Sequence, residues 1–359
     1  FVSVLAVLIA FAIGAILIAL SGASVVDAYY AMFRGSIVDP NAANAVRMIK
    51  PLTDSLFYSI PLIISGLGLA LGFRAGLFNI GGKGQIIVGA LAAVWVGFAV
   101  NLPPVLHTLV ALLVAVIAGG LYGGIAGVLK AKTGANEVIV TIMLNSIATL
   151  GLGYTLAQKA WQVPGTNQPV TPKVAESAAL ARLLPAPFKL HVGFLVALVA
   201  LVAFWWLIER STLGFQIRAV GANAAAARTA GISVERITAI TMVLSGAFLG
   251  LAGANEALGT IGYVSRDVAG SIGFDAITVA LLGRNKTWGT FGAGLLFGAF
   301  KAGGYTMQAK GVPIDMILIL QSVIVLLIAA PALVRWLFRL PDVRALAANT
   351  RKGNTDEHK

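Results

Sequence analysis

Apolar residues are gathered along this chain into long runs that short polar segments separate. A helix needs about 20 mostly apolar residues to cross the hydrocarbon core of a bilayer, so these runs predict about ten membrane-spanning helices, the eighth of them short. They cover residues 3–22, 56–73, 84–101, 105–129, 137–157, 190–208, 237–256, 271–283, 289–307 and 315–334. The expected fold class is an all-α polytopic membrane protein, organised as a single transmembrane domain over residues 1–359.

Two connections between the spans are long enough to have structure of their own. Residues 21–55 contain "SVVDAYYAMFRG", which is apolar and aromatic with few charges and predicts a helix at the membrane interface. Residues 158–189 hold several prolines, which favour a loop of defined, extended course. We expect both segments to be extracytoplasmic, where the second would receive an external partner.

The basic residues predict the orientation of the chain in the membrane. Arginine and lysine are concentrated in alternate connections, whereas the short connections between them are poor in charge. The positive-inside rule therefore places residues 209–236, the tail 335–359 and both termini in the cytoplasm. Other cations expected on that side are Arg74, Lys83, Lys130, Lys132, Arg284 and Lys286. The opening apolar run exceeds the roughly 7–15 residues of a signal-peptide core, so it is expected to be an uncut membrane helix.

Composition excludes several classes of protein. Hydrophobic residues make up 58% of the chain and charged residues only 11%, whereas about a quarter of a soluble domain is charged. Cations held on one side of a membrane explain the net charge of +12, so nucleic acid is not an expected partner. The chain has no cysteine, which excludes thiolate chemistry, and no metal-binding motif. An intramembrane Ser–His hydrolase is disfavoured, because His107 and His191 lie at span ends. No enzyme activity is expected.

The stretch "GLFNIGGKGQ", Gly76 to Gln85, invites comparison with a phosphate-binding P-loop. That motif requires a glycine where Leu77 stands and a metal-binding Ser or Thr where Gly84 stands. A P-loop also joins a strand to a helix, but this stretch joins two apolar runs that are long enough to be membrane helices. The sequence therefore predicts a glycine-rich break between membrane helices, and no nucleotide site.

One connection, Glu209 to Ile237, is far longer than most links between helices. Its middle, Ala222 to Ala230, is rich in alanine and is expected to form a short helix with Gly221 and Gly231 as breakers at its ends. A short helix held beside a membrane suits docking into a groove of another protein. The alternative is an ordinary solvated connector.

Polar residues within the spans are candidates for a pathway, because polar groups are costly in a bilayer. For each of them the alternative is a hydrogen bond between helices or a helix cap. Together they predict a polar seam. The candidates are Asn79, Gln85, Asn136, Glu137, Thr141, Asn145, Asn255, Glu256 and Gln321, with Asp275 at the start of the eighth span. No acidic residue is expected to meet a basic partner in mid-span, which weakens an ion-coupled mechanism.

The two halves of the chain also resemble one another in outline. Five spans precede residue 158 and five follow residue 190, so corresponding helices would run in opposite directions, as in an inverted repeat. Both halves contain glycine-interrupted stretches, "FNIGGKGQ" and "LGRNKTWGTFGAG". An ion-coupled secondary transporter therefore remains an alternative function. A separate stripe of small residues, Gly119, Gly123 and Gly127, predicts close packing of the fourth span against a neighbour.

Four motifs in order resemble those of a known family. They are "GFRAGLFNIGGKGQIIVGA", "GANEVIVTIMLN", "GFQIRAVGANAAAARTAGI" and "SIGFDAITVALLGRNKTWG". Together they resemble the permease subunits of bacterial ABC importers for nucleosides, within the branched-chain amino acid and simple-sugar permease superfamily. "TNQPVTPKVAESA" in the long outer loop is also similar to the nucleoside branch. The resemblance runs from about Leu56 to the tenth span.

The resemblance implies a type II-like ABC importer permease in the bacterial inner membrane. Such a subunit binds no cofactor. A separate ATPase subunit binds ATP and Mg²⁺, a second permease completes the pore, and an extracytoplasmic lipoprotein delivers the nucleoside; simple sugars or other small polar solutes are the alternative cargo. The glycines around Lys83 would permit a break in the helix, and Asn79 would satisfy the backbone groups that the break frees. Carried over by position, the coupling helix that enters the ATPase would use Arg218, Gly221, Asn223, Ala226, Arg228 and Gly231.

Overall fold

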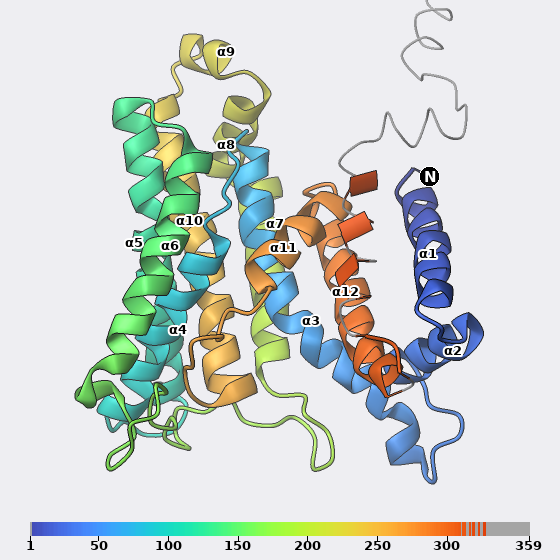
Figure 1. Cartoon of the computed structure of the whole chain (residues 1–359). Coiled ribbons are helices and arrows are strands. Elements are labelled where there is room, and N and C mark those ends of the chain that lie inside the picture. The colour runs from blue at the N-terminus through green and yellow to red at the C-terminus, as the bar shows by residue number, and fades with distance from the viewer. Residues whose placement is uncertain are drawn as a thin grey trace, which may run out of the picture.

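The computed structural model describes residues 2–309 and, beyond them, 311–313, 316, 318–319, 322–323 and 326–327, with side chains from Leu8 onward. The described chain is helical (Figure 1), and its one strand-like pairing is an isolated bridge between Arg182 and His191. The elements are α1 (Val2–Leu20), α2 (Val25–Ser36), α3 (Ala45–Arg74), α4 (Gly82–Ala99), α5 (Leu106–Thr133), α6 (Glu137–Ala157), η1 (Lys159–Trp161), α7 (Gly193–Arg210), α8 (Thr212–Ala222), α9 (Ala224–Thr229), α10 (Val234–Asn255), η2 (Glu256–Ile261), α11 (Ile272–Leu282) and α12 (Thr287–Gln308).

These helices confirm an all-α, multi-pass membrane protein. Six of the described helices, α3 to α7 and α10, are long and apolar enough to cross a bilayer, and α11 is a shorter apolar helix, as expected for the eighth span. Gln321 and most of the tenth expected span lie outside the described residues. The clearest difference is α3, which begins at Ala45 and not near residue 56. It begins early because the Asn44 side chain caps it by accepting a hydrogen bond from the Arg47 N–H at 2.9 Å.

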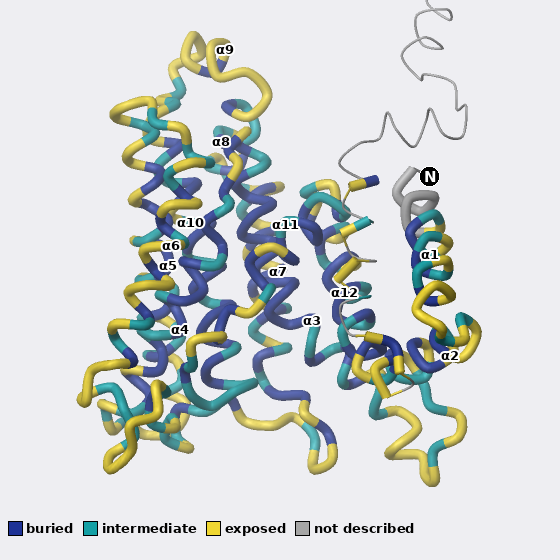
Figure 2. The backbone as a smooth tube through the Cα atoms, viewed as in Figure 1, coloured by how far each residue is buried: buried dark blue, intermediate teal, exposed yellow. Residues whose placement is uncertain are grey.

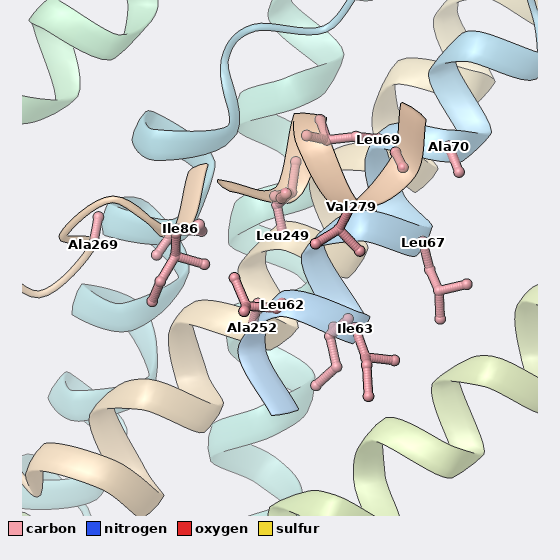
Figure 3. Packing of buried hydrophobic residues seen from close by; sticks show 14 of the residues in the cluster. Leu62, Ile63, Leu67, Leu69, Ala70, Ile86, Leu249, Ala252, Ala269 and Val279 are labelled. Atoms are coloured by element: carbon pink, nitrogen blue, oxygen red, sulfur yellow. The ribbon is translucent and has the colours of Figure 1, made fainter. Parts of the chain in front are cut away.

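The centre of the bundle is α3. In the most apolar 18-residue stretch of α3, 83% of the residues are buried, whereas in that of α6 only 22% are. Protein therefore surrounds α3, and α6 faces outward. Figure 3 shows Leu62, Ile63 and Leu67 of α3 in the same core as Leu249 of α10 and Val279 of α11. The outward faces of α5, α6 and α7 carry exposed Leu109, Leu113, Leu150, Tyr154 and Val199 (Figure 2), as expected of helix faces that contact lipid.

The glycine stripe of α5 packs directly on α10. A Cβ atom added to Gly119 would lie 2.6 Å from the Cα atom of Gly250, and one added to Gly123 would lie 2.6 Å from the carbonyl oxygen of Met242. Gly127 meets Ala239 in the same way. The small-residue stripe therefore lets the two backbones touch, as the sequence predicted.

Two segments cover the end of the bundle that lies opposite α9, which is the lower end in Figure 1. The predicted interfacial helix is α2, and it buries Ala28, Ala31 and Met32 while Val26 remains exposed. The proline-rich segment is an extended loop, as predicted. Backbone hydrogen bonds hold it to η2 and to the connection that follows: Leu180 N–H donates to the Leu258 carbonyl and Thr171 N–H to the Val264 carbonyl.

Candidate functional site

The connection between α3 and α4 turns back into the bundle. Asn79 is 1% exposed, and its Nδ2 donates to Ser245 Oγ of α10 at 2.9 Å. Helix α10 begins at Val234, and Ser245 lies about three turns further on, roughly 16 Å along the helix axis. Gly82, the first residue of α4, packs there against Gly273 at the start of α11. The first residues of α4 and of the short helix α11 therefore lie against each other inside the protein.

Lys83 accordingly lies elsewhere than the sequence predicted. The charge pattern placed it with Arg74 in a connection at the cytoplasmic surface, but it is in the first turn of α4, where its backbone contacts Gly273. Only Arg74 is at the end of α3. The chain can re-enter here because polar side chains replace the water that a surface loop would use.

Asn79 organises the break, as the sequence predicted. Its Oδ1 accepts a hydrogen bond from the Gly81 N–H at 2.9 Å, and its Nδ2 donates to Gln85 Oε1 at 3.1 Å. Gln85 is 1% exposed, so both side-chain amides are satisfied within the protein. These contacts give Asn79 and Gln85 a structural role. Their place in a substrate pathway stays a prediction.

Two residues of α6 hold the same break from the other side. Thr141 Oγ1 accepts from the Ile80 N–H at 3.2 Å. Asn145 bridges the break: its Oδ1 accepts from the Gly84 N–H at 2.7 Å, and its Nδ2 donates to the Ile80 carbonyl at 2.8 Å. The turn-apart spacing of Thr141 and Asn145 therefore presents two polar groups to one short stretch of backbone.

Replacing Asn145 by leucine is expected to destabilise the protein by about 2 kcal/mol, because a donor and an acceptor of the buried break lose their partner. The measurement is the thermal unfolding midpoint of the detergent-solubilised chain. Thr149→Leu is the matched control, since Thr149 is exposed one turn along α6. Equal midpoints for the two variants would contradict the structural role of Asn145.

Asn136 and Glu137 act as end groups of helices. Asn136 is the N-cap of α6, and its Oδ1 accepts from the Val138 N–H at 2.9 Å. Glu137 accepts a hydrogen bond from Lys130 Nζ at 2.5 Å and one from the Phe78 N–H at 3.4 Å. These contacts match the capping alternative, and a pathway role for the pair stays a prediction.

Asn255 and His191 form a second group of polar side chains, near the end of the bundle that lies opposite α9. Asn255 is fully buried, and neither of its side-chain polar atoms has a hydrogen-bond partner among the described residues. His191 lies beside it across Gly193, and its Nε2 is also buried and unpaired within the described chain. Within the described residues, three buried polar atoms therefore lack a hydrogen-bond partner here, which is unusual for a protein interior. Directly after Asn255, Glu256 opens a π-helical turn, a distortion that is frequent at functional sites.

An ion pair crosses the interior between α11 and α12. Lys301 Nζ lies 2.8 Å from Asp275 Oδ2, and Ser271 Oγ donates to the same carboxylate oxygen at 2.7 Å. Glu256 also has Lys301 as a charged neighbour. The expectation that no acidic residue meets a basic partner in mid-span is therefore wrong. It was drawn within single spans, whereas this pair joins two helices.

Lys301 is the functional candidate that the sequence reasoning missed. It is the single charged residue of the apolar run "GTFGAGLLFGAFKAGGYTM", and a lysine within a span is itself a signal of function.

A cavity of about 970 Å³ opens between α2, α3 and α12. Its charged lining residues are Arg34, Asp39, Arg47, Lys50, Asp54 and Lys189. Tyr58 and Tyr305 also line it and pack on each other, with ring centroids 5.4 Å apart. None of the predicted pathway residues that the structure describes lines this cavity.

The predicted coupling segment projects from the other end of the bundle (Figure 1), as α8 followed by α9. Asn223 separates these helices and caps α9, because its Oδ1 accepts from the Ala226 N–H at 3.1 Å. Gly231 ends the turn in a left-handed conformation, with φ of 83°. Arg228 pairs with Glu235, and both side chains are largely exposed. Ala227 is the one buried residue of α9.

The sequence predicted that Gly221 would break the helix, and this prediction is wrong. Gly221 lies within α8. Asn223 supplies the break, because its side chain competes for the backbone and starts a new helix. Gly221 is instead a contact residue: a Cβ atom there would collide with the carbonyl oxygen of Arg74. Its lack of a side chain lets α8 rest on the end of α3.

Arg74 joins this contact to a third element. Its Nε donates to the carbonyl oxygen of Asn285, in the turn between α11 and α12, at 2.8 Å. Arg218, three residues before Gly221 on α8, is half-buried. One of its guanidinium nitrogens is buried without a partner among the described residues. The α8–α9 segment is thus connected to α3 and to the helix pair that carries Asp275 and Lys301.

Comparison with known proteins agrees with these features. Residues 52–329 match the family model described as branched-chain amino acid transport system / permease component. The chain is 40% identical to the guanosine ABC transporter permease protein NupP of Bacillus subtilis, over 93% of this chain and 94% of that protein. It is 35% identical to the glucose ABC transporter permease protein TsgB13 of Haloferax volcanii, over 90% and 85%. It is 31% identical to the nucleoside ABC transporter permease protein NupB of Lactococcus lactis, over 97% and 95%.

No solved structure matches the chain. The family match covers well over half of the sequence, and the relatives align over nearly their whole length. The chain therefore belongs to the branched-chain amino acid transport system permease family, as an ABC transporter permease.

Proposed function

We propose that this chain is the membrane-spanning subunit of an ATP-driven importer that carries nucleosides. Two of the similar relatives are named for guanosine and for nucleosides, at 40% and 31% identity. A third, at 35%, is named for glucose, which supports simple sugars as the alternative cargo. In this proposal the chain itself performs no covalent chemistry and binds no cofactor.

The observation that carries the proposal is the α8–α9 segment. It presents two short helices beyond the end of the bundle, and α9 exposes nearly all of its surface (Figure 2). A separate ATPase subunit, which binds ATP and Mg²⁺, would receive α9 in a groove. Closure of the ATPase would then push on α8, and the contacts of Gly221 and Arg74 would carry that movement to α3 and to the α11–α12 turn.

The rest of the assembly follows from the same proposal. A second permease, identical or homologous, would complete the pore, and a substrate-binding lipoprotein would dock on the extracytoplasmic loops 21–55 and 158–189. The concentration of arginine and lysine around α8, α9 and Lys130 supports a cytoplasmic position for that end, in a bacterial inner membrane. Both termini would then be cytoplasmic.

Destroying the docking helix tests this proposal. Ala226→Pro removes the N–H that donates to the Asn223 side chain, so α9 loses its N-terminal cap, and Arg228→Glu reverses an exposed charge. Each is expected to reduce copurification of the ATPase at least about tenfold, which corresponds to about 1.4 kcal/mol, while the chain still inserts into the membrane.

Arg182→Glu is the matched control for the charge reversal, since Arg182 is exposed in the loop at the opposite end. It should copurify the ATPase as the unmodified chain does. Normal ATPase yields from both α9 variants would show that the segment is a solvated connector.

A second function is favoured by one observation. The Lys301–Asp275 pair gives the interior a titratable group, which an ion-coupled secondary transporter would need. Uptake that collapses with an ionophore and survives ATP depletion would establish that mechanism instead.

A further inference from the structure

Charged side chains line the cavity between α2, α3 and α12. Arg34 pairs with Asp39 at 2.6 Å, and Lys50 pairs with Asp54 one helical turn along α3. Asp54 uses only one carboxylate oxygen in that pair. Its other oxygen, Oδ1, is buried and has no hydrogen-bond partner among the described residues. Charged side chains of both signs therefore line the cavity, and they can exchange hydrogen bonds with a polar molecule.

Two aromatic rings also line the cavity. Tyr58 lies one turn beyond Asp54 on α3 and meets Tyr305 of α12, with 34° between the ring planes. Tyr305 is 52% exposed, so the surface of its ring is open to the cavity. A flat, open aromatic ring is a stacking platform for a planar heterocycle, since every nucleobase has a π-face.

The two tyrosines also lie close to the buried charges. Lys301 and Tyr305 are four residues apart on α12, so they share one face of that helix. Tyr58 lines the cavity and also has Glu256 as a neighbour. A molecule resting on the tyrosines would therefore be one helical turn from the group formed by Lys301, Asp275 and Glu256.

We propose that this cavity is the first binding site for the transported nucleoside within the permease. The base stacks on Tyr305, and the hydroxyl groups of the pentose hydrogen-bond to charged side chains that line the cavity, such as Lys50. The cavity, at about 970 Å³, is at the upper end of the 300–1,000 Å³ of typical ligand pockets, so it has room for a base and a pentose. This inference rests on the proposed function, because it concerns the same cargo.

The first test measures ATP-driven guanosine uptake by the complete importer in proteoliposomes. Tyr305→Leu removes the stacking surface and is expected to raise the guanosine concentration for half-maximal uptake about tenfold, the cost of losing an aromatic partner for a base. Tyr305→Phe keeps the ring and should behave like the unmodified protein. Tyr154→Leu is the matched control, because Tyr154 is 71% exposed on α6, outside the cavity. Equal values for Tyr305→Leu and Tyr154→Leu would overturn the site.

A second test does not depend on transport. The chain has no cysteine, so Thr306→Cys places a unique thiol in the cavity wall of the full-length permease. Guanosine is expected to slow its labelling by a maleimide about tenfold at saturation, whereas glucose, which has no base, should not. Thr166→Cys, exposed in the long loop, is the control that neither solute should protect.

The outcomes separate the site from the function. Labelling of Thr306→Cys that guanosine leaves unchanged, with normal guanosine uptake by the unmodified importer, overturns the site alone. Protection by glucose together with uptake of glucose and not guanosine overturns the nucleoside assignment in both proposals.

Discussion

Replacing Lys301 by methionine is expected to destabilise the protein by about 3 kcal/mol. The substitution leaves the Asp275 carboxylate inside the bundle without its cation, and removing one partner of a buried ion pair costs about 3–5 kcal/mol. The lower end of that range applies because the Lys301 side chain is 22% exposed. The measurement is the unfolding midpoint of the solubilised chain against denaturant, with Lys310→Met as a control for loss of a positive charge.

The double variant Lys301→Met, Asp275→Leu makes this prediction specific. The double variant contains no unpaired carboxylate at this position. It should therefore recover at least half of the stability that Lys301→Met alone loses. If the single and double variants are equally unstable, Lys301 stabilises the helices through packing and not through its charge.

Gly119→Ala is expected to cost about 3 kcal/mol, at the upper end of the range for overpacking. The added methyl group would lie within 2.6 Å of backbone atoms of Gly246 and Gly250, so α5 and α10 must move apart along their contact. Side-chain rotation offers no relief, since the atoms that it meets belong to the backbone. The readout is again the unfolding midpoint, together with the yield of folded chain.

Gly151→Ala controls for the substitution itself. Gly151 lies on α6 with no atom within 4 Å of an added Cβ, so alanine there should be neutral or slightly stabilising through its higher helix propensity. A Gly119→Ala protein as stable as Gly151→Ala would mean that α5 and α10 are not held at backbone contact.

The hydrophobic pattern predicted the helices well because bilayer thickness fixes their length. For example, the expected span 84–101 is α4, Gly82–Ala99, and the expected span 137–157 is α6 without change. The early start of α3 was missed because its first turns, which the Asn44 cap and the Lys50–Asp54 pair stabilise, interleave polar residues with apolar ones and so fall outside the continuous apolar run. The buried return of the chain at Asn79 was expected only as a break, since its depth depends on partners far along the sequence, such as Ser245.

The candidate site was harder to predict. A polar residue in a span is equally suited to a cap, to a bond with a buried loop or to a pathway, and only its neighbours distinguish these roles. Asn136 proved to be a cap, and Asn145 serves the break. The cavity residues Asp54 and Tyr58 lie near the start of α3, where the pattern indicated the edge of a span.

The most direct test of the central claim is uptake of radiolabelled guanosine by proteoliposomes that contain this permease, its ATPase, the second permease and the binding lipoprotein. We expect uptake to require enclosed ATP and the ATPase, to persist with an ionophore, and to disappear with Ala226→Pro. Guanosine uptake by the permease alone, driven by an ion gradient without ATP, would contradict the account.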